Sequence, residues 1–188
     1  MILSQNNFNK YLNQKYIFET RPEIAVAVSG GPDSMCLAFL LNNWVKKNRG
    51  FLTAIIIDHG IRKESFNESK YVKNYLSKFK IKSVILRISK KNIIKKTMNE
   101  ARSNRFNKLI NYCTRKNILH LFLGHHYDDN LETYLLRKLA GSNFEGLRAM
   151  QNKSSLEKLQ ILRPLLAFNK QIILKYNYVK KINFLEDP

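Results

Sequence analysis

Short apolar runs alternate with amphipathic segments along most of the chain. The apolar runs are rich in Ile, Val and Leu, which is typical of strands buried on both faces of a sheet. They cover residues 24–28, 52–57, 84–88, 118–123 and 159–162. Helical spacing predicts helices over residues 35–47, 68–79, 101–113, 129–140 and 169–181, with a further helix within the first 20 residues. This alternation predicts an α/β fold with a five-stranded parallel sheet and helices on both faces.

The chain has no internal repeat and no linker that would divide it. Its 188 residues, 44% of them hydrophobic, are enough to form one core, so we expect a single domain over residues 1–188. Residues 142–158 show no clear period and are expected to form a functional loop. The sequence contains neither a membrane-length apolar run nor a secretory signal pattern, so we expect a cytoplasmic or organelle-matrix protein. The two cysteines, Cys36 and Cys113, are expected to be buried free thiols.

The net charge narrows the range of partners. Thirty-three Lys and Arg residues against 14 Asp and Glu residues give +19, which favours a polyanionic partner such as nucleic acid. More than half of the excess lies between Arg62 and Lys96, where only Glu64 and Glu68 are acidic. The alternative is compositional bias, since an AT-rich genome also produces a chain rich in Lys, Asn and Ile.

A glycine-rich hexapeptide follows the first apolar run and opens the next helix. It comprises Ser29, Gly30, Gly31, Pro32, Asp33 and Ser34. Glycines let a backbone approach a ligand closely, and free N–H groups at a helix start attract phosphate. The hexapeptide fits neither the Walker pattern nor the dinucleotide pattern. Asp33 would repel a phosphate unless a cation lay between them, which implies Mg²⁺ at Asp33. The alternative is an ordinary turn capped by Ser29 or Asp33.

Further candidate residues follow other strands or open other helices. Because ligands bind at the carboxyl ends of parallel strands, these segments are expected to meet. The candidates are Asp58, His59, Arg62, Arg102, Arg105, His125, His126, Asp128, Asp129 and Glu132. Arg102 and Arg105 share one helix face, although a solvated face is the alternative. The acidic residues suit a cationic substrate, although helix capping would also explain them. Metal binding by His125 and His126 is disfavoured, and His120 is expected in the core.

The hexapeptide resembles the PP-loop of the N-type ATP pyrophosphatases. The ordered series of motifs beyond it resembles the tRNA(Ile)-lysidine synthetase family from about Ile24 to the last residue. These motifs are Asp58–Arg62, Asn99–Phe106, Leu123–Thr133, Leu139–Ser142, Gly146–Met150, Arg163–Leu166 and Glu186–Pro188. Asn130 departs from the family, which usually has glutamine there. Members of the family usually continue into further domains that help to hold the tRNA, and a dimer is one way in which this chain could manage without them.

The resemblance implies a reaction and roles for the candidates. Enzymes of this family adenylate the C2 oxygen of the wobble cytidine in an isoleucine tRNA with a CAU anticodon, and free L-lysine then displaces AMP. The resemblance implies ATP at the hexapeptide, Asp58, His59 and Arg62, with Mg²⁺ at Asp33. Asp33, Arg102 and Glu132 would be catalytic, and Asp129 with Glu132 would bind lysine. Arg105, His125, His126 and Asp128 would contact the nucleotide or base.

Two other functions compete with this interpretation. A PP-loop tRNA thiolase would need reactive cysteines, and both cysteines here lie in apolar helical patterns. A basic RNA-binding module without catalysis would not need the acidic and arginine candidates described above.

Overall fold

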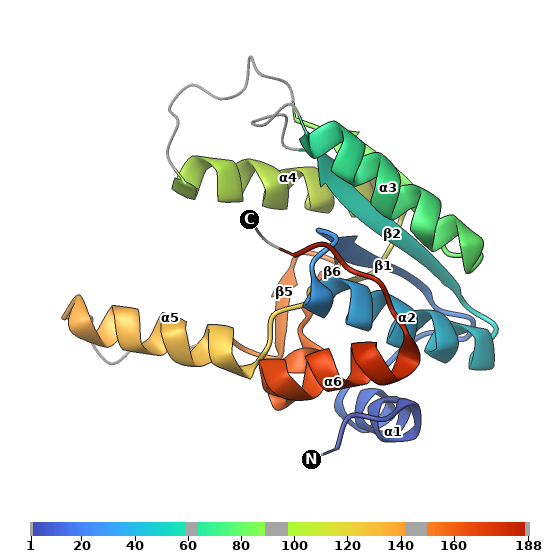
Figure 1. Ribbon diagram of the computed structural model, residues 1–188, viewed down its shortest axis with the longest axis horizontal. Coiled ribbons are helices and arrows are strands. Elements are labelled where there is room, and N and C mark those ends of the chain that lie inside the picture. Colours follow the sequence, from blue (N-terminus) through green and yellow to red (C-terminus); the bar gives the residue numbers. More distant parts are fainter. Residues whose placement is uncertain (1, 59–63, 89–97, 142–149, 187–188) are drawn as a thin grey trace.

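The computed structural model describes residues 2–58, 64–88, 98–141 and 150–186 (Figure 1). One sheet forms its centre, in the strand order β3-β2-β1-β4-β6-β5. The strands are β1 (Glu23–Val28), β2 (Phe51–Asp58), β3 (Lys82–Arg87), β4 (His120–Phe122), β5 (Lys153–Leu156) and β6 (Leu159–Leu162). The helices are α1 (Gln5–Lys15), α2 (Pro32–Lys47), α3 (Ser65–Lys78), α4 (Met98–Arg115), α5 (Tyr127–Leu139) and α6 (Lys170–Lys180), with a 3₁₀ turn at Pro164–Ala167.

The five predicted strands form a parallel sheet, and the prediction of an α/β fold is confirmed. The strand count was wrong by one. Strand β5 lies in the segment expected to be a loop and pairs antiparallel with β6 through a short hairpin. Its residues Lys153 to Leu156 are mostly polar and all at least partly exposed, so no apolar run marked it. A strand at the edge of a sheet needs no apolar faces, which is why periodicity missed it.

The two faces of the sheet bury different residues because side chains alternate along each strand. Ile24, Val26 and Val28 of β1 face a large core formed with α1, α2, α3 and α6. Ala25 faces the opposite side, where Leu109 and Cys113 of α4 complete a smaller core. The prediction of helices on both faces is therefore confirmed.

The connections create a crevice above the centre of the sheet. The chain leaves β1 toward β2 and β3 on one side, and returns across the sheet through α4 to β4 on the other side. Strands β1 and β4 are parallel neighbours, with Ile24 opposite His120. Their carboxyl ends thus lie at a switch point, where ligands of open α/β sheets bind.

Helix α5 extends away from the sheet (Figure 1). The predicted helix is confirmed, but none of its residues is buried, and its leucine side chains face solvent. These are Leu131, Leu135, Leu136 and Leu139. Among the helices that the structure describes, none combines the length and apolarity needed to cross a bilayer.

Candidate active site

The hexapeptide forms a compact loop between β1 and α2. The hydroxyl of Ser34 donates to the carbonyl of Gly31 at 3.0 Å and accepts the backbone N–H of Ser29 at 3.2 Å. The hydroxyl of Ser29 accepts the backbone N–H of Gly31 at 3.3 Å. Helix α2 begins at Pro32, with Gly31 as its N-cap and no side chain capping it. The alternative of a turn capped by Ser29 or Asp33 is therefore wrong, and the start of α2 keeps an uncapped positive dipole end.

Two glycines in and beside this loop leave no room for a side chain. Gly30 has φ +100°, and a Cβ there would lie 2.8 Å from Val72 and 2.9 Å from Leu185. Gly124 follows β4, where a Cβ would lie 3.1 Å from the backbone nitrogen of Ser34. A Cβ at Gly31 would meet only Ser29 Oγ, at 3.5 Å. The loop is thus packed from behind at Gly30 and open at Gly31, as close approach of a ligand requires.

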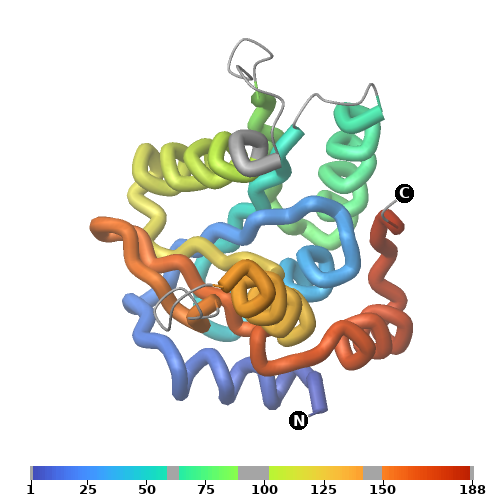
Figure 2. Tube along the Cα trace, turned by 90° about the vertical axis from the view of Figure 1, so that its left-hand side faces the viewer, coloured from blue at the N-terminus to red at the C-terminus, as the bar shows by residue number. Residues whose placement is uncertain are grey.

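A cavity of about 820 Å³ opens at the carboxyl ends of the strands. Helices α3 and α4 rise beside these strand ends at the same end of the molecule, as Figure 2 shows. Seven of the candidate residues line the cavity: Ser29, Gly31, Asp33, Ser34, Arg102, Arg105 and His125. The structure therefore brings together three segments that are far apart in the sequence.

One wall of the cavity carries positive charge, although the acidic residues Asp33, Glu68 and Glu186 also line the cavity. Arg102 of α4 and Arg163, which follows β6, both line it, and their mutual repulsion together with burial lowers the pKa of Arg163. Burial and these two arginines lower the pKa of His125 to about 4, so its imidazole is neutral at physiological pH. His125 Nδ1 and Arg163 Nε are both buried without a hydrogen-bond partner. Buried donors and cations left in this state favour an anionic ligand with several acceptor oxygens.

Asp33 faces this wall from the start of α2. Burial raises the pKa of its carboxyl group, and Asp129 adds to the rise, while His126 and Lys170 oppose it. Its Oδ1 is buried without a hydrogen-bond partner. Among the described residues, no group of three or more His, Cys, Asp and Glu side chains could hold a metal ion. A single unpaired carboxylate oxygen beside a phosphate site nevertheless fits Mg²⁺, which typically binds one or two carboxylates, substrate phosphates and water.

The acidic residues at the start of α5 make hydrogen bonds that stabilise the fold. His126 is the N-cap, and Asp129 completes a capping box by accepting the backbone N–H of His126 at 2.8 Å. Asp128 Oδ2 accepts the backbone N–H of Lys170 at 2.7 Å and so joins α5 to α6. The alternative considered for these acids, Asp128 or Asp129 as the N-cap, is therefore wrong, although Asp129 takes part in the capping box at the third helical position. His126, Asp128 and Asp129 do not line the cavity, and neither does Glu132, which is exposed.

Asp58 also differs from its predicted place. It is buried, does not line the cavity, and accepts hydrogen bonds from Ser65 at 2.7 Å and Arg87 at 3.0 Å. These contacts tie the end of β2 to α3 and β3. The other two residues predicted in this segment, His59 and Arg62, lie outside the described residues.

Several cavity residues were not predicted. Arg163 follows a strand directly, as the predicted segments do, and that position was the available signal. Ser65, Glu68 and Ser69 line the cavity from one face of α3, which was assigned only as a helix. Met150 also lines it, and its backbone N–H donates to Asn130 Oδ1 at 2.6 Å. The shorter amide at position 130 therefore still makes a backbone contact.

Residues 3–188 match the PP-loop domain family. The chain belongs to this family. Membership implies the use of ATP, and the resemblance drawn from the PP-loop motif is confirmed. The cavity described above lies beside the PP-loop hexapeptide of this domain.

Curated relatives carry the resemblance further. The chain is 37% identical over 182 residues to a tRNA(Ile)-lysidine synthase of Orientia tsutsugamushi, covering 97% of this chain and 41% of that protein. It is 41% identical over 167 residues to one of Wolbachia pipientis, covering 88% and 39%. The resemblance to lysidine synthetases is therefore confirmed. The chain spans about two fifths of the length of these relatives.

Solved structures support the fold. The U34-tRNA thiolase NcsA of Methanococcus maripaludis, which carries a [4Fe-4S] cluster, matches with a TM-score of 0.80 at 19% identity, covering 97% of this chain and 66% of that one. The NH3-dependent NAD synthetase of Campylobacter jejuni matches with a TM-score of 0.54 at 18% identity, covering 96% and 75%. At these identities the likeness concerns the architecture alone.

The remaining sequence predictions concern buried residues of this PP-loop domain. Cys36 and Cys113 are free and buried, as expected, and burial raises the pKa of both, that of Cys113 to about 12. Neither thiol lines the cavity. His120 is buried, as predicted, with its Nε2 2.7 Å from Glu19 Oε2 and its ring against Phe18.

Proposed function

We propose that this PP-loop domain adenylates the wobble cytidine of the isoleucine tRNA with a CAU anticodon and joins L-lysine to it. The cytidine C2 oxygen attacks the α-phosphorus of ATP, and pyrophosphate leaves. The amine of lysine then attacks C2, and AMP leaves with that oxygen. The products are lysidine, AMP and pyrophosphate.

The observation that carries the proposal is that an uncapped helix start and the side chains of Arg102 and Arg163 line one cavity. The hexapeptide offers N–H groups and an open Gly31 to the phosphates of ATP. Arg102, Arg163 and the neutral His125 lie on the same cavity. Charge that develops on the leaving pyrophosphate and on the adenylated oxygen would be stabilised there by donors already in place. The names of the curated relatives support tRNA(Ile) as the acceptor.

Asp33 would hold Mg²⁺ with the oxygens of ATP, and the ion would neutralise charge on the phosphates. The unpaired Oδ1 of Asp33 supports this role. The fold keeps this carboxylate close to His126 Nε2, at 3.8 Å, which limits its orientation before any ligand arrives.

Lysine would bind beside the cavity at the start of α5. Asp129 Oδ1 is not used by the capping box, and Glu132 lies one turn later on an exposed face. A carboxylate there would attract the ammonium group and accept its proton, since only the free amine is nucleophilic. Lys170 acts electrostatically on Asp33 in the same region. The acidic residues thus already have one cation, Lys170, near them. The ammonium group of a lysine substrate would be attracted by the same carboxylates.

The experiment measures ATP–pyrophosphate exchange and incorporation of labelled lysine, each with a CAU-anticodon tRNA. We expect both activities to require that tRNA, and Arg102→Gln to reduce exchange by at least a hundredfold through loss of a charge-stabilising donor. A folded protein with neither activity would contradict the proposal. Sulfur transfer is not favoured, because both thiols are buried with raised pKa values.

A further inference from the structure

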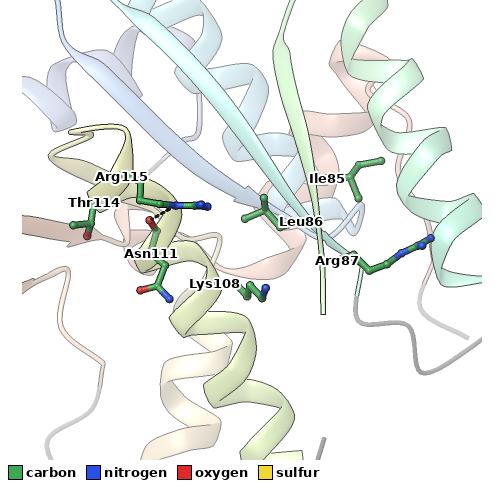
Figure 3. Close-up of a pocket in the computed structure, with 7 residues that line it drawn as sticks. All are labelled: Ile85, Leu86, Arg87, Lys108, Asn111, Thr114 and Arg115. Atoms are coloured by element: carbon green, nitrogen blue, oxygen red, sulfur yellow. Dashed lines mark hydrogen bonds between the residues drawn. The ribbon is translucent and has the colours of Figure 1, made fainter. Parts of the chain in front are cut away.

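A second groove, of about 530 Å³, lies between α4 and β3 (Figure 3). Strand β3 is the last strand at its edge of the sheet, and α4 covers the adjoining face. The residues that line the groove are Ile85, Leu86, Arg87, Lys108, Asn111, Thr114 and Arg115. Three of these described residues are cationic and none is acidic, so the groove favours a negatively charged ligand.

The edge strand supplies open backbone groups to this groove. Ile88 donates its backbone N–H to the carbonyl of Asp58 on β2 at 2.9 Å. Backbone groups alternate in direction along a strand, so those of Ile85 and Arg87 point away from β2. Among the described strands, β3 has no neighbour on that side, so these N–H and C=O groups lie at the edge of the sheet beside the groove. The groove therefore offers both donors and acceptors at its strand wall.

The helix wall of the groove supplies positive charge, and Arg115 Nε donates to the backbone carbonyl of Asn111 at 3.3 Å. Lys108 and Arg115 extend from α4 toward β3, whereas Arg87 extends away from α4 (Figure 3). Arg87 is held by Asp58 at 3.0 Å and lies over the ring of Phe66, 4.3 Å from its centroid. Arg87 thus fixes the end of the strand, and Lys108 and Arg115 are the two cations directed into the groove.

Helix α4 connects the groove with the cavity. Arg102 and Arg105 line the cavity, and Lys108 and Arg115 line the groove. At 1.5 Å per residue, Arg102 and Arg115 are roughly 20 Å apart along the helix axis. A cationic track of this length can follow a nucleic-acid strand from the reacting base onto its neighbours.

We propose that this groove binds the ribose–phosphate backbone of the RNA whose base enters the cavity. Lys108 and Arg115 would contact phosphates, and the open groups of Ile85 and Arg87 would pair with 2′-hydroxyls. A 2′-hydroxyl is both donor and acceptor, which matches a strand edge that presents N–H and C=O together. A phosphodiester group has no donor for those carbonyls. The inference rests on the proposed function only in taking RNA as the substrate.

The test removes the two directed cations in Lys108→Gln/Arg115→Gln. The matched control, Lys10→Gln/Lys15→Gln, removes the same charge from exposed positions of α1. Helix α1 lies at the opposite end of the molecule from α4 in both views (Figures 1 and 2). With a CAU-anticodon stem-loop RNA, we expect Kd to rise about tenfold in the groove variant and the slope of log K against log salt to fall by about 1.5. The control should change Kd less than twofold. Equal effects of the two variants would overturn the proposal.

Two further measurements identify the ligand. The wild type should prefer the RNA stem-loop to DNA of the same sequence, and the groove variant should lose part of that preference. An unchanged preference would overturn the ribose contacts. ATP affinity should stay the same, whereas weaker ATP binding with unchanged RNA binding would make the groove a nucleotide site and overturn the proposal.

The RNA-binding readout is independent of catalysis. If the wild type makes no lysidine but the groove variant still loses RNA affinity, the proposed reaction fails and the groove assignment stands. If lysidine forms and the groove is correctly assigned, the variant should raise KM for RNA about tenfold and leave kcat within twofold.

Discussion

His126 Nε2 lies 3.8 Å from Oδ2 of Asp33, so the residue that caps α5 reaches back to the start of α2. His126 Nδ1 accepts the backbone N–H of Asp129 at 3.4 Å, so Nε2 is the ring nitrogen that lies toward Asp33. The capping of one helix therefore orients the side chain beside the proposed metal ligand on another. This coupling could not be seen from spacing, since the two residues are 93 positions apart.

Substitutions of Asp33 should distinguish a role in catalysis from a role in folding. We expect Asp33→Ala and Asp33→Asn to abolish ATP–pyrophosphate exchange, because neither holds Mg²⁺. Since burial raises the pKa of this carboxyl group, its charged form destabilises the fold at neutral pH. Both variants should therefore have a Tm no lower than that of the wild type. Stem-loop RNA should bind within twofold of wild type, and an equal loss of RNA binding and exchange would make Asp33 structural.

The two glycines of the loop should respond differently to alanine. Gly30→Ala forces a Cβ against Val72 and Leu185 at positive φ, so we expect it to cost about 2 kcal/mol of unfolding free energy. Gly31→Ala meets only Ser29 Oγ and should leave stability within about 0.5 kcal/mol. Its methyl group would nevertheless occupy the space in which phosphate approaches.

Urea unfolding and ATP binding measured on both variants distinguish these effects. Gly31→Ala should weaken ATP binding at least tenfold while remaining fully folded. Unimpaired ATP binding by Gly31→Ala would show that the nucleotide does not approach the loop there.

The parallel architecture followed directly from the sequence because buried parallel strands are continuous apolar runs with little competing explanation. The loop formed by the hexapeptide was also predictable, because its glycines lie between a predicted strand and a predicted helix. Strand β5 was not, because its pairing with β6 depends on a neighbour and not on its own apolar pattern. The exposed leucines of α5 illustrate the same limit of sequence patterns. Helical spacing predicts a helix, but it does not predict which element packs against that helix.

The candidate site was predicted by segment more reliably than by residue. Arg102 and His125 line the cavity, but Asp58 turned toward α3 and β3. Successive residues at the end of a strand point alternately toward the cavity and toward neighbouring elements. The sequence alone does not show which of the two directions a given side chain takes. Arg163 was not predicted as a site residue. It lies in a recognised motif, but that motif assigned no role to its side chain.

A substitution of Asp58 should distinguish a structural role of this residue from a role in ligand binding. Asp58→Ala removes a buried carboxylate together with its hydrogen bonds from Ser65 and Arg87, so we expect a loss of about 2 kcal/mol of unfolding free energy, moderated by the exposure of Arg87. ATP affinity of the folded fraction should stay within threefold, because Asp58 does not line the cavity. Calorimetric titration below the Tm of the variant checks this. A tenfold loss of affinity without loss of stability would restore Asp58 to the ATP site.

His125 should make the fold sensitive to acid. Burial and the charges of Arg163 and Arg102 lower its pKa from 6.5 to about 4, so the unfolded chain binds a proton more readily than the folded protein between these values. The stabilising contribution is therefore complete above pH 6.5 and is lost as the pH falls toward 4. Between pH 7.5 and 5.0 the wild type should lose about 2 kcal/mol more than His125→Asn, which cannot titrate. Urea unfolding of both proteins in phosphate-free buffer measures the difference. Contributions common to both proteins cancel in this comparison. Parallel curves would mean that the pKa of His125 is the same in the folded and unfolded states, which would contradict its burial beside Arg163 and Arg102 as a neutral imidazole.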